Sequence, residues 1–268
     1  TTLGKIQLYN FSDGELRVAF EENIRNEDVF IIQSTNPPSS NVLELLFMLD
    51  AARRASANRV IAVVPYFGYA RQDRKDEPRV PISARVLLDL MNVVGINRIM
   101  AMDLHSPQIQ GFINTPFDHL YSSMALFDRL KEFDLNFDSG IVLAPDVGSA
   151  KISQSYAKRL GVGFALIDKR RPKPNEAKVA HIVGELKDKH VIIIDDMIDT
   201  AGTICNAAET AMNKGASSVT AVGTHPVLSG ESIKRLSNSP INKVIVCNTI
   251  DIPEHKKFDK LEIISVAH

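Results

Sequence analysis

The chain has 268 residues, of which 44% are hydrophobic and 24% are charged, and its formal net charge is -1. This composition excludes a disordered chain. The balanced charge excludes a general attraction to nucleic acid or to an acidic membrane, so any anion site must be local. No apolar run is long enough to cross a bilayer and no basic-then-apolar leader opens the chain, so we expect a cytoplasmic protein. Cys205 and Cys247 lie far apart, outside any metal-ligand or redox spacing, which indicates buried thiols in a reducing compartment.

Short apolar runs alternate with segments of helical period in the first half of the chain. Val29–Ile32 predicts a strand, and the apolar spacing over 42–52 predicts a helix after it. Further strands are predicted at 60–64 and 98–102, with a helix over 82–93 between them. Continuous apolar strands between amphipathic helices indicate a parallel sheet that is covered on both faces.

The same alternation restarts in the second half. One helix is predicted to end at Gly161, and another runs from about Thr203 to a Lys214-Gly215 cap. Two α/β units are therefore expected, with a boundary near Tyr121 to Met124, which gives domains of residues 1–123 and 124–268. The strands predicted in this half are 141–143, 164–167, 191–194, 219–222, 244–246 and 263–264.

The most informative stretch begins where an Ile-rich strand ends in Asp195 and Asp196 and turns into a helix. In an open α/β sheet, ligands bind at such a strand-to-helix crevice. The backbone N–H groups of the turn can surround a monophosphate, helped by two threonine hydroxyls and by the positive end of the helix. We predict that this phosphate cradle is formed by Asp199, Thr200, Ala201, Gly202 and Thr203.

The two acids before the cradle need a separate role, because carboxylates repel phosphate. Asp195 and Asp196 are placed to accept hydrogen bonds from vicinal ribose hydroxyls, which favours a sugar phosphate as the ligand. The alternative is a strand end where one Asp merely caps a helix, and it leaves the remaining acids and one threonine unexplained. No Gly-rich loop ending in Lys-Ser or Lys-Thr and no Gly-x-Gly-x-x-Gly occurs, so any ATP binds without a Walker-type loop.

Residues 195–203 resemble the phosphoribosyl diphosphate motif of type I phosphoribosyltransferases. The whole chain resembles one branch of that fold, the ribose-phosphate diphosphokinases, also called phosphoribosyl pyrophosphate synthetases. The resemblance implies an α/β fold of two phosphoribosyltransferase-like domains, each a mainly parallel sheet flanked by helices. It places ATP-binding contributions in the first domain, and ribose 5-phosphate binding and a catalytic loop in the second. Five further segments carry it in the expected order: 11–15, 69–75, 102–112, 167–172 and 224–230.

The resemblance also implies the reaction. The β,γ-diphosphoryl group of ATP passes to the 1-hydroxyl of ribose 5-phosphate, which gives AMP and 5-phosphoribosyl 1-diphosphate for nucleotide biosynthesis. Lys169 and Arg171 match the family's catalytic basic residues on a mobile loop, and cations there suit a reaction that spreads negative charge over phosphoryl oxygens. Read without the cradle, the same residues would be an ordinary solvated basic turn.

For ATP, Arg71 and Gln72 match the family's binding residues, while Asp13 and Glu15 match residues that approach the nucleotide from a neighbouring subunit. A solvated surface loop is the alternative for the charged segment that begins at Arg71. The shared site implies a homo-oligomer, at least a dimer and, as is common in the family, a hexamer.

For Mg²⁺, His105 and Asp103 match residues that act near the metal and the ATP phosphates, and His105 is also a predicted catalytic residue. Asp146 matches a second acid associated with the metal. Mg²⁺ prefers oxygen ligands and keeps several waters, so one or two carboxylates with phosphate oxygens are sufficient. Asn114 stands where many relatives carry an acid before Asp118, which leaves a second cation there open.

Three rival functions are weighed against the enzyme. A non-catalytic regulatory subunit would lose the cradle or the Lys-x-Arg pair, and this chain keeps both. A transcriptional regulator that binds phosphoribosyl diphosphate would need a DNA-reading module, and neither a helix-turn-helix nor a basic stripe is evident. A phosphoribosyltransferase that consumes the product would need one such domain with a hood that recognises a base, whereas this chain shows two α/β units and matches to the ATP site.

Overall fold

The structure is a computed structural model that describes residues 3–132, 139–170 and 179–267. Its contacts divide the chain into two compact units, Thr1–Tyr121 and Ser122–His268. Each unit holds its own sheet and its own hydrophobic core.

The sheet of the first unit has four parallel strands in the order β3-β4-β5-β6. Its strands are β3 (Asp28–Ile32), β4 (Arg59–Val64), β5 (Arg98–Met102) and β6 (Phe117–Leu120). The helices are α1 (Ser40–Arg54), α2 (Ser83–Val94) and the short 3-10 helix η1 (Pro107–Phe112). The helices predicted over 42–52 and 82–93 and the strands predicted at 29–32, 60–64 and 98–102 are confirmed within a few residues.

Alternation along the strands decides what the first core contains. Val60, Ala62 and Val64 of β4 join the core cluster that includes the buried faces of α1 and α2. On β3 the flanking side chains Phe30 and Ile32 are each 59% exposed, while Ile31 between them is buried. One face of β3 is thus covered by this unit, and the other presents apolar side chains on its surface.

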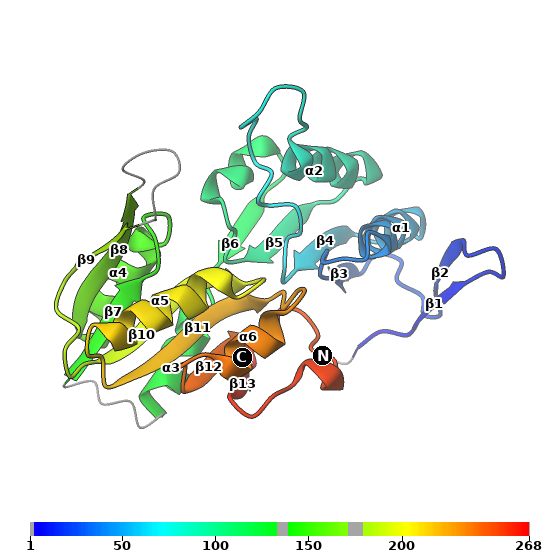
Figure 1. Cartoon of the computed structure of the whole chain (residues 1–268). Helices are drawn as coiled ribbons and strands as arrows, with labels where there is room; N and C mark the ends of the chain where they lie inside the picture. The colour runs from blue at the N-terminus through cyan, green and yellow to red at the C-terminus, as the bar shows by residue number, and fades with distance from the viewer. Residues whose placement is uncertain (1–2, 133–138, 171–178, 268) are drawn as a thin grey trace. The chain divides into compact units, whose positions relative to one another are not determined.

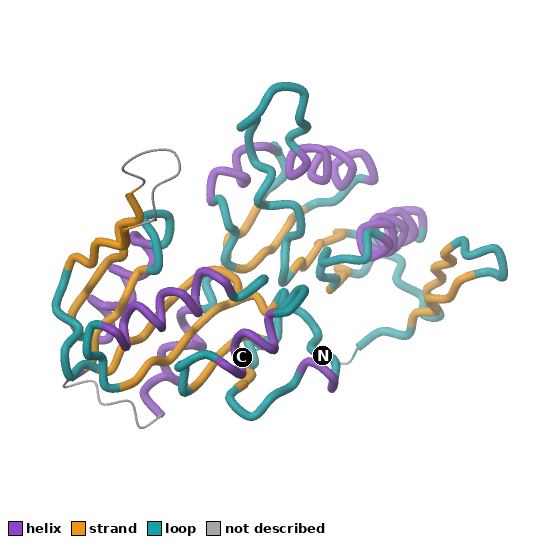
Figure 2. Tube along the Cα trace, viewed as in Figure 1, coloured by secondary structure: helices purple, strands orange, loops and turns teal. Residues whose placement is uncertain are grey.

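A β-hairpin precedes this sheet and was not anticipated from the sequence. Strands β1 (Ile6–Asn10) and β2 (Leu16–Phe20) pair antiparallel, and Figure 2 shows them as a separate two-stranded ribbon. Their turn contains Gly14 at a φ of 94°, a conformation that favours glycine. The hairpin carries Asp13 and Glu15 in its turn, so two residues assigned to ATP lie on a local structure that the apolar periodicity did not predict.

The second unit contains a seven-stranded sheet in the order β13-β12-β11-β10-β7-β8-β9. All neighbouring strands are parallel except β8 and β9, which form an antiparallel pair at one edge. The strands are β7 (Gly140–Ala144), β8 (Gly163–Arg170), β9 (Val179–Val183), β10 (His190–Ile198), β11 (Ser218–Pro226), β12 (Lys243–Cys247) and β13 (Leu261–Ile264).

Helices cover both faces of this second sheet. The helices are α3 (Ser123–Glu132), α4 (Ala150–Leu160), α5 (Gly202–Asn213), α6 (Ser232–Asn238) and the 3-10 helix η3 (Glu254–Lys256). Ile193 of β10 packs in the cluster with α5 and α6, whereas Ile192 and Ile194 pack in the cluster with α3 and α4. Figure 1 shows α5 lying along the sheet over β10 and β11. Continuous burial on both sides explains why residues 191–194 of β10 are all apolar.

The ends of the helices follow the predicted signals. Gly161 ends α4 at a φ of 72°, and Gly215 follows the Lys214 cap of α5 at a φ of 86°. Both glycines adopt the left-handed conformation that terminates helices. At its other end α5 begins directly after β10, so the strand-to-helix turn lies at the carboxyl edge of the sheet, next to the carboxyl ends of β7 and β11.

Candidate active site

The turn between β10 and α5 has the features of an anion cradle. The first helical N–H groups, those of Gly202, Thr203 and Ile204, have no acceptor within the described parts of the chain, and Cys205 N is the first to bond back, to Ala201 O at 3.0 Å. Ala201 precedes them at a φ of 62°, in the left-handed region. Unpaired N–H groups at a helix start, with the positive end of the helix dipole, are suited to bind phosphate.

The side chains of the cradle differ in accessibility. Thr200 and Thr203 are exposed, which leaves their hydroxyls accessible to a ligand. Asp199 is half-buried, and one of its carboxylate oxygens accepts a hydrogen bond from the Ser229 hydroxyl. Asp199 therefore shares its carboxylate with the protein, so its part in holding the sugar phosphate is at least partly structural.

Asp195 and Asp196 lie within β10, which extends beyond the predicted strand 191–194 to Ile198, and the two acids are close enough to affect each other. Asp196 N donates to Asp195 Oδ1 at 3.0 Å. Burial, together with the neighbouring carboxylates of Asp196 and Asp146, raises the pKa of Asp195 to about 8. Desolvation and two like charges both disfavour its ionised form. Without ligand, Asp195 thus carries a proton near neutral pH, while cations or hydroxyl donors at the site would favour the carboxylate.

Asp146 follows β7, the strand next to β10, and this adjacency brings it towards Asp195. Its Oδ1 accepts hydrogen bonds from Ser149 N at 3.0 Å and from Ser149 Oγ at 3.3 Å. Asp146 therefore also organises the turn into α4. The sequence suggested Asp146 only through family resemblance, and its proximity to Asp195 follows from the order of strands in the sheet.

The predicted catalytic pair falls at the edge hairpin. Lys169 lies on β8, where its backbone pairs with Ala180 of β9, so this position belongs to a strand and not to a loop. The strand predicted at 164–167 extends to Arg170 because β9 supplies hydrogen-bond partners. Arg171 lies outside the described residues.

In the first unit, Asp103 and His105 follow β5 in a tight turn. Asp103 is buried and adopts a φ of 36°, while His105 is exposed. The turn is attached to β6, because Asp103 N donates to Leu120 O and Leu104 N donates to His119 Nε2, both at 2.9 Å. A non-glycine residue at positive φ held by hydrogen bonds on each side is typical of functional turns.

His119 was not identified from the sequence. Burial lowers its pKa, which keeps the ring neutral and lets Nε2 accept the Leu104 N–H. Its Nδ1 is buried and has no hydrogen-bond partner among the described residues. The ring lies against Tyr121 with centroids 4.4 Å apart. The sequence did contain one signal for it. His119 lies near the carboxyl end of β6, and the carboxyl ends of the neighbouring parallel strands β5 and β6 meet at one edge of the sheet.

The ATP candidates Arg71 and Gln72 lie on an exposed loop of the same unit. The loop is connected to the segment after His105, because Asp73 accepts hydrogen bonds from the Ser106 hydroxyl and from Gln108 Nε2. The first unit therefore brings the Arg71–Gln72 loop and the Asp103–His105 turn together. Asp13 and Glu15 lie on the separate hairpin, where Asp13 Oδ1 accepts the Glu15 N–H at 3.0 Å.

The metal candidates supply few ligands within each unit. Across the described ranges, no three His, Cys, Asp or Glu side chains converge closely enough to hold a metal ion. The donor chemistry still fits Mg²⁺, which needs only one or two carboxylates when water and phosphate oxygens complete its shell. Both oxygens of Asp118 accept from Arg98 Nη1 at 2.7 Å, so this acid already has a cationic partner.

Models of known families match both ends of the chain. One, described as the N-terminal domain of ribose phosphate pyrophosphokinase, matches residues 1–95. Another, described as the phosphoribosyl synthetase-associated domain, matches residues 170–267. The chain is 50% identical to the ribose-phosphate pyrophosphokinase of Chlorobaculum tepidum over 268 residues, which are 100% of this chain and 82% of that protein. It is 48% identical to the enzyme of the same name from Aquifex aeolicus, over 96% of this chain and 82% of that protein.

A solved structure agrees with these sequences. The phosphoribosylpyrophosphate synthetase of Mycobacterium smegmatis superposes with a TM-score of 0.91 at 38% identity, covering 99% of this chain and 87% of that one. Parallel sheets flanked by helices, together with this match, define the two-domain phosphoribosyltransferase class of fold. The chain belongs to the ribose-phosphate pyrophosphokinase family. No described helix is long and apolar enough to cross a membrane.

Proposed function

We propose that this chain is a ribose-phosphate diphosphokinase, which transfers the β,γ-diphosphoryl group of ATP to the 1-hydroxyl of ribose 5-phosphate. The observation that carries the proposal is the set of N–H groups of Gly202, Thr203 and Ile204 at the start of α5, which have no partner in the described chain. They follow the neighbouring acids Asp195 and Asp196. The relatives named ribose-phosphate pyrophosphokinase support the same reaction.

The cradle would hold the 5-phosphate of the sugar. The main-chain N–H groups and the hydroxyls of Thr200 and Thr203 supply donors, and the helix dipole favours the negative charge. Asp195 and Asp196 would accept hydrogen bonds from the ribose hydroxyls and fix the orientation of the ring. A sugar held at both ends presents its 1-hydroxyl in one direction, which lowers the entropic cost of the attack on ATP.

Lys169 and Arg171 are the proposed catalytic residues for the transfer, together with His105. A phosphoryl transfer places negative charge on the oxygens of the transferred group, so fixed cations supply most of the stabilisation. Arg can grip a phosphoryl group through two parallel N–H bonds, and Lys adds a compact charge. The antiparallel β8–β9 pair gives Lys169 a backbone position at the edge of the sheet.

The proposed co-substrate is ATP, bound with contributions from Arg71, Gln72, Asp13 and Glu15. Mg²⁺ is the proposed cofactor. Asp103 and His105 of the first unit are proposed to hold it, and Asp146 of the second unit is proposed as a second acid associated with the metal. When bound, Mg²⁺ neutralises charge on the phosphate oxygens of ATP. The carboxylates of Asp103 and Asp146 suit this ion better than the His105 nitrogen, because Mg²⁺ favours oxygen.

We propose a cytoplasmic homo-oligomer, at least a dimer and, as the family resemblance implies, a hexamer. No nucleic acid and no membrane takes part in the proposed reaction. The balanced net charge of -1 agrees with small anionic substrates that are recognised locally.

An AMP-release assay tests the proposed function. The protein is incubated with ATP, Mg²⁺ and ribose 5-phosphate, and AMP and phosphoribosyl diphosphate are quantified. We expect the two products in equal amounts, with no AMP when ribose 5-phosphate is omitted. A second arm supplies phosphoribosyl diphosphate with each nucleobase. Formation of a nucleoside monophosphate there, without the first activity, would replace the proposal with a phosphoribosyltransferase.

A further inference from the structure

The segment after β11 runs beside the cradle and bonds to it residue by residue. Strands β10 and β11 pair in parallel up to Ile198 and Pro226. Beyond this pair, Leu228 N donates to Ile198 O at 2.9 Å, and Ser229 N donates to Asp199 O at 3.1 Å. The main-chain pairing therefore continues past the sheet and into the turn that forms the anion site.

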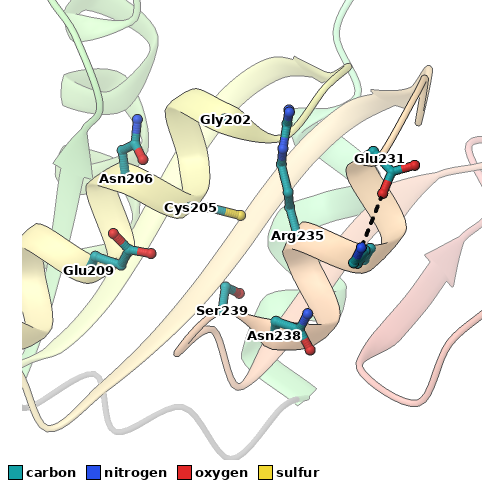
Figure 3. A pocket seen from close by; sticks show the side chains of 9 residues that line it. Gly202, Cys205, Asn206, Glu209, Glu231, Arg235, Asn238 and Ser239 are labelled. Atoms are coloured by element: carbon teal, nitrogen blue, oxygen red, sulfur yellow. Dashed lines mark ion pairs between the residues drawn. The ribbon is translucent and has the colours of Figure 1, made fainter.

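Two side chains extend the same series. The Ser229 hydroxyl donates to the Asp199 carboxylate, and Arg235 Nη1 donates to Thr200 O at 2.9 Å. Figure 3 shows Arg235 reaching from α6 towards the start of α5. Lys234 of the same helix forms an ion pair with Glu231, at 3.6 Å. Three successive carbonyls of the cradle, those of Ile198, Asp199 and Thr200, thus accept from one segment.

These bonds determine the direction of the Thr200 and Ala201 N–H groups, which lie in the cradle just before the unpaired N–H groups of Gly202, Thr203 and Ile204. A trans peptide plane carries its C=O and its N–H on opposite sides. When the carbonyls of Asp199 and Thr200 are held towards the β11–α6 segment, the N–H groups of Thr200 and Ala201 point away from it. Hydrogen bonds in series also polarise one another, so the Arg235 charge on Thr200 O makes the Ala201 N–H a stronger donor.

We propose that Ser229 and Arg235 are positioning residues, which orient the Thr200 and Ala201 amides of the phosphate cradle without touching the substrate. This proposal rests on the proposed function and names residues 227–235 as the support of its phosphate site. Arg235 lies close to the start of α5 as well, because its Nη1 is 4.0 Å from the position that a Cβ atom would take on Gly202. It also lines a groove of about 700 Å³ between α5 and α6, with Gly202 and Glu209 among the other lining residues.

The test compares Arg235→Ala, Arg235→Lys and Ser229→Ala with Lys234→Ala, a neighbouring exposed cation on the same helix. Arg235→Ala is expected to raise KM for ribose 5-phosphate about five- to tenfold, the effect of one charge-assisted hydrogen bond, and to leave kcat and KM for ATP within about twofold. Arg235→Lys keeps a donor and should recover part of the loss. Ser229→Ala should act in the same direction, and Lys234→Ala should match the parent protein.

A calorimetric titration with inorganic phosphate separates this proposal from the proposed function. If the parent protein binds phosphate but releases no AMP, the reaction is wrong, and the positioning role is then judged by phosphate affinity alone. Weaker phosphate binding by Arg235→Ala, with an unchanged melting temperature, would support the role. Phosphate affinity equal to that of the parent in both Arg235→Ala and Ser229→Ala would overturn it. The proposal would also be overturned if Arg235→Ala lowered kcat and raised the KM for ribose 5-phosphate and the KM for ATP by similar factors. Such a uniform loss would indicate general structural damage.

Discussion

Asp195 is the residue whose chemistry depends most on its surroundings. Its pKa is raised from 3.8 to about 8 by burial and by the carboxylates of Asp196 and Asp146. A folded-state pKa above the unfolded value means that the native protein binds the proton more tightly between these two values. The contribution of Asp195 to stability is therefore fully present at low pH and is lost as pH rises towards 8.

We expect Asp195→Asn to raise the melting temperature at pH 8 and to change it little at pH 4, because the amide keeps the shape of the acid without its charge. The gain in unfolding free energy at the higher pH should be about 2 kcal/mol, once coupling to the neighbouring acids is allowed for. Thermal melts across the pH range provide the measurement. The exposed Asp251→Asn is the control, and a gain independent of pH would contradict the assigned cause.

Lys169 provides the second prediction at this scale. Lys169→Ala should abolish turnover, a loss of at least about a thousandfold, because a fixed cation at developing phosphoryl charge contributes several kcal/mol. Binding of ribose 5-phosphate should stay within about threefold of the parent value, since Lys169 lies on β8 and the cradle lies on the turn between β10 and α5. Steady-state kinetics measures the turnover, and calorimetry measures the binding of ribose 5-phosphate. Turnover that survives the substitution would remove Lys169 from the catalytic residues.

Among the elements, α6 is short and depends on a side chain from outside it. Lys260 Nζ donates to Ser237 O and to Ser239 O, each at 2.9 Å, and lies 3.5 Å from Leu236 O. Ser237 lies in the last turn of the seven-residue α6 and Ser239 is its C-cap residue, so the carbonyls of these two residues have no donor within the helix. The ammonium group thus caps α6, the helix that carries Arg235.

We expect Lys260→Met to lower the unfolding free energy by about 2 kcal/mol, because hydrogen bonds from a charged donor are lost while the side-chain volume is kept. Urea denaturation measures the change, and Lys151→Met at an exposed position of α4 serves as the control. Loosening of α6 should also raise KM for ribose 5-phosphate through Arg235. Equal stability of the two variants would show that the cap contributes nothing.

At the scale of the whole molecule, α2 indicates self-association. Its buried residues include Leu87, Leu88 and Met91, yet Val86, Leu90 and Val93 on the other side are 52%, 44% and 75% exposed. A helix that is apolar on both sides is usually covered on both. Together with the proposed sharing of the ATP site, this exposed stripe favours a surface between copies of the chain.

The prediction is that the protein in solution is larger than its 29.6 kDa chain and that Val93→Glu reduces its mass. A charge placed in a desolvated interface has no partner, so assembly should weaken by at least about tenfold in dissociation constant. Light scattering after size-exclusion chromatography gives the masses. Met212→Glu, on an exposed part of α5, is the control, and a monomeric parent protein at micromolar concentration would exclude the oligomer.

The sequence by itself determined the features that lie within one contiguous segment. The apolar run of β10, its two terminal acids and the small residues before α5 predict strand, turn and helix, because backbone propensity and burial act locally. The residues that suit a phosphate and a ribose could also be identified from the sequence, because they lie in the same contiguous segment. Most of the longer strands and helices were predicted, whereas β6, α3, β9, α6 and the first hairpin were not. Short edge and terminal elements depend on their neighbours for stability.

Only the tertiary structure decided which distant residues meet at the cradle. Arg235 follows Thr200 by 35 residues, and it reaches the Thr200 carbonyl because β10 and β11 are neighbours in the sheet. Asp146 approaches Asp195 because β7 pairs with β10 on the other side. The order of strands is set by packing of the whole sheet, and no local pattern encodes it. For that reason the raised pKa of Asp195 and the support of the cradle could not be read from the sequence.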